Sequence, residues 1–163
     1  MLEAEKLKMK ELNQVCVVVK DLDKSMEQYL KILGVGPWQV YTYAPPDLKN
    51  TTVRGKPEPY SMKLALAMIG PVMLELIQPL KGKSHYKEFL EKRGEGLHDI
   101  AAFRVEDIDE VIAHLKKQGI GVLMSGEWHG GRFAYMDTEK QLGTVVELVW
   151  RPGPRPPPER TYP

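Results

Sequence analysis

Two stretches of the chain share one order of apolar and polar positions. Residues 15–35 read VCVVVKDLDKSMEQYLKILGV, and residues 101–120 read AAFRVEDIDEVIAHLKKQGI. Each begins with a short apolar run, passes through an acidic turn, continues with apolar residues three or four positions apart, and reaches a glycine. This pattern predicts a strand followed by an amphipathic helix that ends at Gly34 or Gly119. The chain therefore contains a weak internal repeat.

The acidic turns offer a start for each predicted helix. Asp21 or Asp23 in the first copy, and Asp107 or Asp109 in the second, are residue types that cap helix N-termini by accepting hydrogen bonds from backbone N–H groups. The sequence leaves open which member of each pair is the cap.

Strand-like sequence follows each predicted helix. The runs are rich in β-branched, aromatic and aliphatic residues, and turn residues separate them. Those after the first helix are PWQVYTY, MKLALAM and VMLELIQ, and those after the second are GVLMS, RFAYMD and TVVELVW. Each copy therefore predicts the order β, α, β, β, β, and the fold class is α+β.

The rest of the sequence divides into connections and ends. We expect residues 44–60 to form a lid or rim loop, because this stretch is long, polar and rich in proline. The tail is too rich in proline for a helix or a central strand, so we expect it to be mobile. The predicted boundaries are a polar lead-in at 1–11, a first βαβββ module at 12–79, a connecting helix at 80–95, a second module at 96–150 and the tail at 151–163.

Composition narrows the class of partner. The chain has 163 residues, which suits one domain or two small halves that share a core. Lys and Arg total 23 against 22 for Asp and Glu, so no bulk charge draws the chain to nucleic acid or an acidic membrane, and we expect a small-molecule partner. Cys16 is the only cysteine, which excludes an intramolecular disulfide. No apolar run is long enough to span a membrane and the first residues are charged, so we expect a cytoplasmic protein.

Two glutamates interrupt apolar strands at equivalent places. Glu75 lies within VMLELI and Glu147 within TVVELVW. Strand alternation places each glutamate on the face opposite the residues that would pack on a helix, so both should point into the concave side of the sheet. An unpaired carboxylate in such a place costs several kcal/mol or takes up a proton, so we expect positive charge nearby.

Two kinds of positive charge are compatible with this pattern. A basic side chain on a neighbouring strand, such as Lys63 or Arg104, would satisfy one glutamate. A divalent cation would satisfy both at once, with ligands from other strands completing the shell. Gln14 and His98, which open the first strand of each copy, are candidates for those ligands.

The residues resemble the vicinal oxygen chelate superfamily, which includes glyoxalase I, methylmalonyl-CoA epimerase and bleomycin resistance proteins. The resemblance runs from about Leu12 to Trp150. It is carried by VVVKDLDKSMEQY, LELIQP, KRGEGLHDIAAFRVEDID and GGRFAYMD followed by LGTVVELV. It implies two βαβββ modules in a curved mixed sheet, a half-barrel cup with helices on the convex side. It also implies a homodimer.

The same resemblance implies one divalent metal ion, Zn, Co, Ni, Mn or Mg. The family places one ligand at the start of each module and one on its last strand, which maps onto Gln14, Glu75, His98 and Glu147. A set of Gln, Glu, His and Glu looks like one form of the glyoxalase I site, whereas RGEGLHDI and LELIQP look more like methylmalonyl-CoA epimerase.

The chain departs from the epimerase pattern at three positions. Gln14 stands where a histidine is usual, and Lys63 stands where a catalytic glutamate is usual. The ligand that opens the second module is usually the second of two histidines, which here is Asp99. One extra residue before Val105 predicts a β-bulge that turns His98 inward, so His98 and Asp99 compete for this position.

The resulting hypothesis is a metal-dependent lyase or isomerase that transfers a proton next to a carbonyl through an enediolate. Glu147 would carry the proton, and Glu75 would be a metal ligand or second base. The substrate would be a thioester, a hemithioacetal or a 2-oxo acid, contacted by Arg132, Lys63 and Tyr135, with Arg54 and Lys56 on the same basic rim. A metal-free binding protein of the same fold is the alternative; a ring-cleaving dioxygenase is disfavoured because it needs two histidines and one carboxylate.

Overall fold

The computed structural model describes residues 12–163, without the side chains of residues 101–103. The described residues form an α+β fold with one mixed 11-stranded sheet. The strands are β1 (Gln14–Val18), β2 (Trp38–Tyr43), β3 (Leu48–Val53), β4 (Lys56–Pro57), β5 (Met62–Ile69), β6 (Val72–Pro79), β7 (Gly96–Arg104), β8 (Val122–Trp128), β9 (Gly131–Met136), β10 (Val145–Trp150) and β11 (Arg160–Tyr162). The helices are α1 (Leu22–Leu33), α2 (His85–Arg93), α3 (Ile108–Lys117) and α4 (Glu139–Leu142). The lead-in predicted at 1–11 lies outside the described residues.

The sheet contains two equivalent four-strand units. One has the order β2-β5-β6-β1 and the other β7-β10-β9-β8, and β1 pairs with β7 between them. In each unit the first strand in sequence is parallel to the last, as in β1 with β6 and β7 with β10, whereas β1 and β7 are antiparallel. The first and last strands of both repeats therefore lie side by side at the centre of the sheet.

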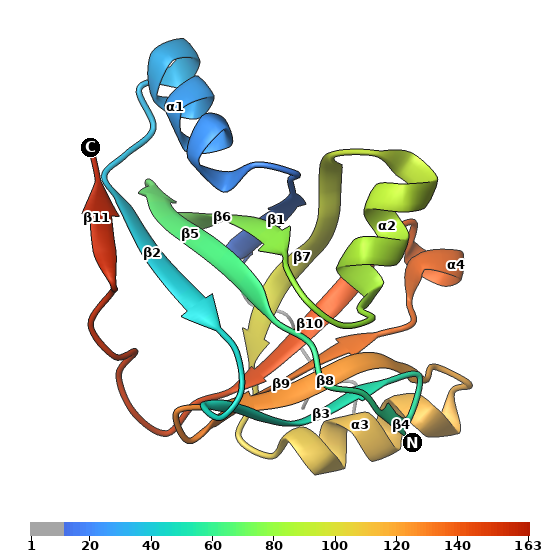
Figure 1. Cartoon of the computed structure of the whole chain (residues 1–163). Helices are drawn as coiled ribbons and strands as arrows, with labels where there is room; N and C mark the ends of the chain where they lie inside the picture. Colours follow the sequence, from blue (N-terminus) through green and yellow to red (C-terminus); the bar gives the residue numbers. More distant parts are fainter. Residues whose placement is uncertain (1–11) are drawn as a thin grey trace.

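Helices α1 and α3 cover the outer faces of the two units (Figure 1). Met26 of α1 packs with Trp38 and Leu76, and Ile108 of α3 packs with Met136 and Leu148. These are the apolar stripes that the helical spacing predicted.

The structure shows which aspartate of each pair caps its helix: Asp21 for α1 and Asp107 for α3. Asp21 accepts a hydrogen bond from the backbone N–H of Lys24, and Asp107 accepts from two N–H groups at the start of α3. At the other end of α1, Gly34 has a φ of 68° and donates its N–H to the carbonyl of Leu30. A glycine adopts this left-handed conformation without a Cβ penalty, so it ends the helix.

A third core fills the inner side of the sheet. Side chains from both units meet there, including Tyr41 and Leu64 from the first and Met124 and Tyr135 from the second. Helix α2, within the predicted connection 80–95, departs from the expectation that helices lie on the convex side, because its Tyr86 belongs to this inner core. Among the described residues, no helix is long and apolar enough to cross a membrane.

Each half of the chain adds a strand to the edge of the other half. Residues 44–60, expected to be a lid or rim loop, instead form β3 and β4, and β3 pairs with β8. Their β-branched stretch Thr51–Val53 suits a strand. The expectation that the tail is mobile is also wrong, because its strand β11 pairs with β2. All of the tail's prolines except Pro163 precede the strand, and an edge position leaves one side free of pairing.

Met26 tests the packing of α1. Its side chain is completely buried between helix and sheet, whereas Ile32 on the same helix is 76% exposed. We expect Met26→Ala to lower the free energy of unfolding by about 2–5 kcal/mol, because it leaves a cavity. Ile32→Ala should change it by less than about 0.5 kcal/mol. Urea unfolding followed by circular dichroism measures both, and equal effects would contradict the assignment of α1's buried face.

Candidate active site

Three of the four polar residues expected at the site meet at the centre of the sheet. Gln14 on β1, Glu75 on β6 and Glu147 on β10 are each at least 93% buried. The Nε2 atom of Gln14 donates to Glu75 Oε2 at 2.7 Å and to Glu147 Oε2 at 3.2 Å. The two carboxylates therefore accept from the same amide, and both face the pocket, which agrees with the strand alternation.

The two carboxylates share a buried environment without an ion-pair partner among the described residues. Burial, and then the charge of Asp99, raise the pKa of Glu75 from 4.5 to about 8. Burial, and then the charge of Glu75, raise the pKa of Glu147 well above its usual value. The charge of Arg155 opposes both shifts without cancelling them. Near neutral pH, this pair holds protons that exposed carboxylates would release.

Bulges in β7 decide where His98 and Asp99 point. In the pairing with β1, Leu97 lies opposite Val17 and Asp99 opposite Cys16, so His98 is the extra residue. The register with β10 shifts again between Ile100 and residue 102. The sequence-predicted bulge is confirmed, and both His98 and Asp99 are buried.

His98 is occupied by two neighbours. Its Nδ1 lies 2.6 Å from Asp99 Oδ2, and its Nε2 lies 2.8 Å from Nδ1 of His85. An ionised carboxylate only accepts hydrogen bonds, so Nδ1 of His98 carries the donated proton. Burial and then the charge of His98 lower the pKa of His85 to about 4, so His85 is neutral near pH 7.

Asp99, by contrast, has a buried oxygen, Oδ1, without a hydrogen-bond partner among the described residues. Its charge is felt by both Glu75 and Glu147. His98 and Asp99 are the two candidates for the ligand at the start of the second module. Of these, Asp99 has an unpartnered oxygen beside the glutamates, whereas both ring nitrogens of His98 have partners.

The donor set fits a divalent cation. Cys16, His98 and Asp99 place one ligand atom each within 4.8 Å of one another. Beside them lie the two glutamates and Gln14, whose amide carries an oxygen as well as its NH2 group. Buried carboxylates with raised pKa values and an unpartnered carboxylate oxygen are what a bound dication would neutralise.

A pocket of about 520 Å³, including its mouth, reaches Gln14, Glu75 and Glu147, whereas Cys16, His98 and Asp99 do not line it. Its walls are largely aromatic. Tyr43 and Trp128 stack with ring centroids 3.7 Å apart, and Tyr86 and Tyr135 meet edge to face on the other wall. The Tyr86 hydroxyl donates to the Tyr135 hydroxyl at 2.7 Å, and Tyr135 in turn hydrogen-bonds to Glu147. This chain of hydroxyls holds the Glu147 carboxyl group in place.

The residues expected to contact substrate lie in three different settings. Tyr135 lines the pocket, but its hydroxyl is engaged by Tyr86 and Glu147. Arg132 lies at the mouth and turns its guanidinium to Asp109 at the start of α3, with contacts of 2.7 and 2.8 Å. Lys63 is exposed and does not line the pocket, because Met62 and Leu64 on either side of it do.

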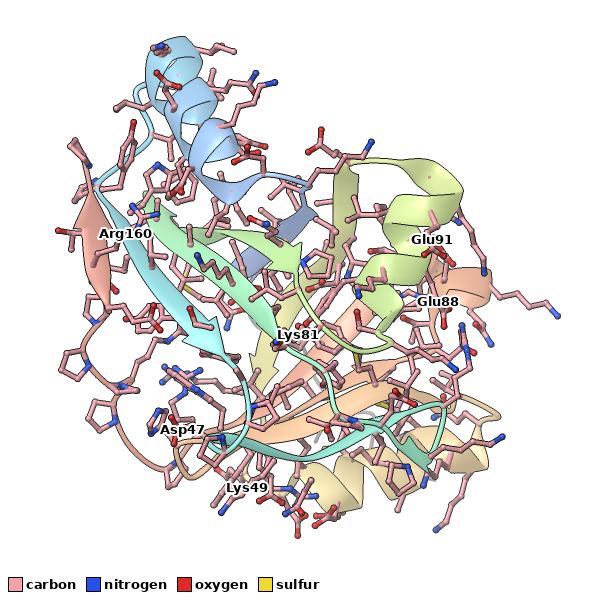
Figure 2. All side chains as sticks on the ribbon, viewed as in Figure 1. Asp47, Lys49, Lys81, Glu88, Glu91 and Arg160 are labelled. Atoms are coloured by element: carbon pink, nitrogen blue, oxygen red, sulfur yellow. The ribbon has the colours of Figure 1, made fainter. Side chains whose placement is uncertain are left out.

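The basic rim is likewise redistributed. Arg54 forms an ion pair with Glu88 of α2 at 2.5 Å, and Figure 2 shows Glu88 on that helix. Besides Arg132, two arginines from the tail line the pocket, Arg151 and Arg155. The sequence offered no signal for them, because a proline-rich segment has no periodicity from which a side chain's direction can be predicted.

Comparisons with known proteins agree with this geometry. A model of the Glyoxalase/Bleomycin resistance protein/Dioxygenase superfamily matches residues 13–135. The ethylmalonyl-CoA/methylmalonyl-CoA epimerase of Cereibacter sphaeroides is 32% identical over 144 residues, which cover 84% of this chain and 95% of that protein. The mitochondrial methylmalonyl-CoA epimerase of Mus musculus is 28% identical over 145 residues, which cover 86% of this chain and 73% of that protein.

Solved structures share the fold. The methylmalonyl-CoA epimerase of Mycobacterium tuberculosis superposes with a TM-score of 0.60 at 25% identity, covering 93% of this chain and 97% of that one. A methylmalonyl-CoA epimerase in complex with methylmalonyl-CoA and NH4+ superposes with a TM-score of 0.61 at 23% identity, covering 92% and 100%.

The raised pKa of Glu75 predicts a pH dependence of stability in the metal-free protein. The folded state holds the Glu75 proton more tightly than the unfolded chain, so this contribution to stability is full below pH 4.5 and is lost as pH rises toward about 8. In urea unfolding with a chelator, we expect Glu75→Gln to reduce that loss by an amount on the order of a few kcal/mol.

Glu91→Gln is the matched control, because Glu91 is exposed on α2 (Figure 2). It should follow the wild-type pH profile. A Glu75→Gln profile that also follows the wild type would show that burial does not hold a proton on this carboxyl group.

Proposed function

Because this chain belongs to the Glyoxalase/Bleomycin resistance protein/Dioxygenase superfamily, we propose that it is an enzyme that moves a proton at a carbon next to the carbonyl of an acyl thioester. One observation carries the proposal: Glu75 and Glu147 are buried together at the base of a pocket and reach the same amide of Gln14. Carboxyl groups with raised pKa values suit proton transfer near neutral pH.

Glu147 is the proton carrier in this proposal. In its ionised form it takes the proton from the carbon, and the electron pair moves onto the carbonyl oxygen. The hydrogen bond from Tyr135, itself held by Tyr86, fixes the direction of the carboxylate, because both phenols are buried and in contact. An oriented base loses less entropy when it meets the carbon acid.

Glu75 is the second proton carrier. Inversion at the carbon requires a proton donor on the face opposite the base, and Lys63, where the epimerase pattern has that residue, is exposed outside the pocket. Glu75 accepts a hydrogen bond from the same Gln14 amide, and its pKa of about 8 in the metal-free protein lets it hold a proton near neutral pH. Return of the proton by Glu147 to the same face regenerates the starting stereoisomer, and delivery of a proton by Glu75 to the opposite face gives the epimer.

The same proposal includes a divalent metal ion, which Gln14, Asp99 and the ionised forms of Glu75 and Glu147 would hold; a glutamate that carries a proton would be detached from the ion. Such an ion, when bound, supplies Lewis-acid stabilisation of negative charge on substrate oxygens. The unpartnered Oδ1 favours Asp99 over His98 as the fourth ligand. His98 then has a supporting role, because its Nδ1 hydrogen bond fixes the Asp99 carboxylate and its Nε2 is engaged by His85.

The names of the relatives guide the choice of substrate class. Two curated relatives that align over most of this chain are called epimerases of methylmalonyl-CoA. Acyl-CoA thioesters are therefore the first candidates, ahead of hemithioacetals and 2-oxo acids. The aromatic walls formed by Tyr43, Trp128 and Tyr86 suit a short acyl chain.

Solvent deuterium exchange tests the reaction and the role of Glu147. We expect the wild-type protein, supplied with divalent metal, to exchange the α-proton of an acyl-CoA substrate such as methylmalonyl-CoA in D2O. Glu147→Gln should lower the exchange rate by at least about 100-fold, because the amide cannot accept the proton. Nuclear magnetic resonance follows the loss of the α-proton signal.

A matched control variant and alternative substrates complete the exchange experiment. Glu91→Gln makes the same change on the exposed face of α2 and should leave the rate unaltered. Exchange that persists in Glu147→Gln would remove Glu147 as the base. Exchange with a hemithioacetal but no acyl-CoA would keep the chemistry and overturn the substrate class.

Metal analysis tests the proposed ligands. We expect about one divalent ion per chain after supplementation, by elemental analysis of the dialysed protein. Asp99→Asn should weaken metal affinity by more than about 100-fold, and His98→Gln by a smaller factor of about 10 to 100, the range of residues that orient a ligand.

The reverse order of these two effects would make His98 the ligand instead of Asp99. Absence of a stoichiometric ion together with absence of exchange would favour the alternative of a metal-free binding protein of the same fold.

A further inference from the structure

The tail crosses from one half of the molecule to the other. It leaves the end of β10 at Trp150 and reaches the outer edge of the first unit, where Arg160, Thr161 and Tyr162 pair with β2. Figure 1 shows this segment running along the edge of the molecule before it ends as β11 beside β2. Two residues of this segment, Arg151 and Arg155, line the pocket.

Several contacts hold the tail in this course. Glu159 accepts hydrogen bonds from the backbone N–H and the hydroxyl of Thr42, at 2.8 and 3.0 Å. Arg160 forms an ion pair with Asp23 of α1. At the end of the chain, a Cβ added to Gly36 would lie 2.9 Å from the backbone of Pro163, so that glycine makes room for the tail. The segment is tied to the first unit on both sides of β11.

Two arginines of the tail line the pocket. Arg155 places its guanidinium over the ring of Tyr41, 5.5 Å from its centroid, and its Nη1 atom is buried without a hydrogen-bond partner among the described residues. Arg151 lies at the end of β10 and lines the same pocket. The ion pairs that the structure records among the described residues include neither arginine.

This arrangement is unfavourable unless an anion completes it. A buried guanidinium N–H without an acceptor carries a desolvation penalty. Arg151 also feels its neighbour, because burial and then the charge of Arg155 lower its pKa. Arg151 and Arg155 place two positive charges beside one pocket, and Arg155 has a hydrogen-bond donor without an acceptor among the described residues. Such a pair can bind a negatively charged group.

We propose that Arg151 and Arg155 form a subsite that binds a free carboxylate on the acyl part of the substrate. The subsite itself follows from the geometry of the tail, whereas its assignment to the acyl part of the substrate rests on the proposed function. The charge of Arg155 acts on both Glu75 and Glu147, so the subsite adjoins the carboxyl groups that move the proton. A carboxylate bound there belongs to the same short acyl group as the reacting carbon.

Two small esters test the subsite without any need for turnover. Monomethyl malonate carries one free carboxylate next to an ester carbonyl, and dimethyl malonate has the same skeleton without charge. By isothermal titration calorimetry, we expect the wild-type protein to bind the monoester at least about tenfold more tightly than the diester, because hydrogen bonds to a charged group contribute that much to affinity. Arg155→Gln and Arg151→Gln should each remove most of that preference.

Conservative and control variants separate the guanidinium from the tail that carries it. Arg155→Lys keeps the charge and loses the paired donors, so it should retain part of the preference. Arg160→Gln removes a charge from the same tail, but Arg160 faces Asp23 at the outer edge (Figure 2). This variant should bind like the wild type.

Three results would overturn the proposal. One is equal affinity of the wild type for the two esters. Another is an equal loss of preference in Arg160→Gln and Arg155→Gln, which would attribute the effect to seating of the tail. The third is competition by inorganic phosphate at the arginines without any preference for the monoester, which would assign the subsite to a phosphate.

The outcome is independent of catalysis. Glu147→Gln should keep the monoester preference, because Glu147 is not a ligand of the carboxylate. A protein that keeps the preference but exchanges no α-proton would refute the proposed function and leave the subsite standing. Exchange of methylmalonyl-CoA that is unchanged in Arg155→Gln and Arg151→Gln would refute the subsite alone.

Discussion

The structure depends on three carboxylates that the sheet buries at its centre. Glu75, Asp99 and Glu147 lie on β6, β7 and β10, which with β1 form four consecutive strands. Burial of acidic groups beside one another opposes folding unless protons or a cation neutralise them. The rest of the fold holds them there, because α1 and α3 pack the outer face and the inner aromatic core excludes water from the other side.

The exchange of edge strands gives the hollow its walls and its positive charge. The β3 strand of the first half extends the second half, and the β11 strand of the second half extends the first. Trp128 of β8 stacks on Tyr43 of β2, so the two units meet across the pocket. The same exchange carries Arg151 and Arg155 past the pocket. A sheet of two units without these additions would hold the carboxylates but lack the cations of the tail.

The sequence predicted what depends on local periodicity and missed what depends on contacts between distant segments. Alternation within VMLELI and TVVELVW was enough to place Glu75 and Glu147 on one face, and the extra residue in β7 was enough to predict a bulge. Lys63 was expected to contact substrate but does not line the pocket. Strand alternation points Met62 and Leu64 into the pocket and Lys63 away from it. The tail could not be placed, because its course is set by pairing with β2 at a separation of more than 100 residues.

Charge balance links the carboxylates to the tail. If a dication were bound and held all three carboxylates in their ionised form, the centre would carry one negative charge, and Arg151 and Arg155 add two positive charges at the edge of the same pocket. The surplus is one positive charge, which one substrate carboxylate neutralises. A neutral ligand would leave that surplus without a counter-charge, and a group with two negative charges would exceed it. In a pocket of low dielectric constant, such differences are large enough to select the ligand by its charge.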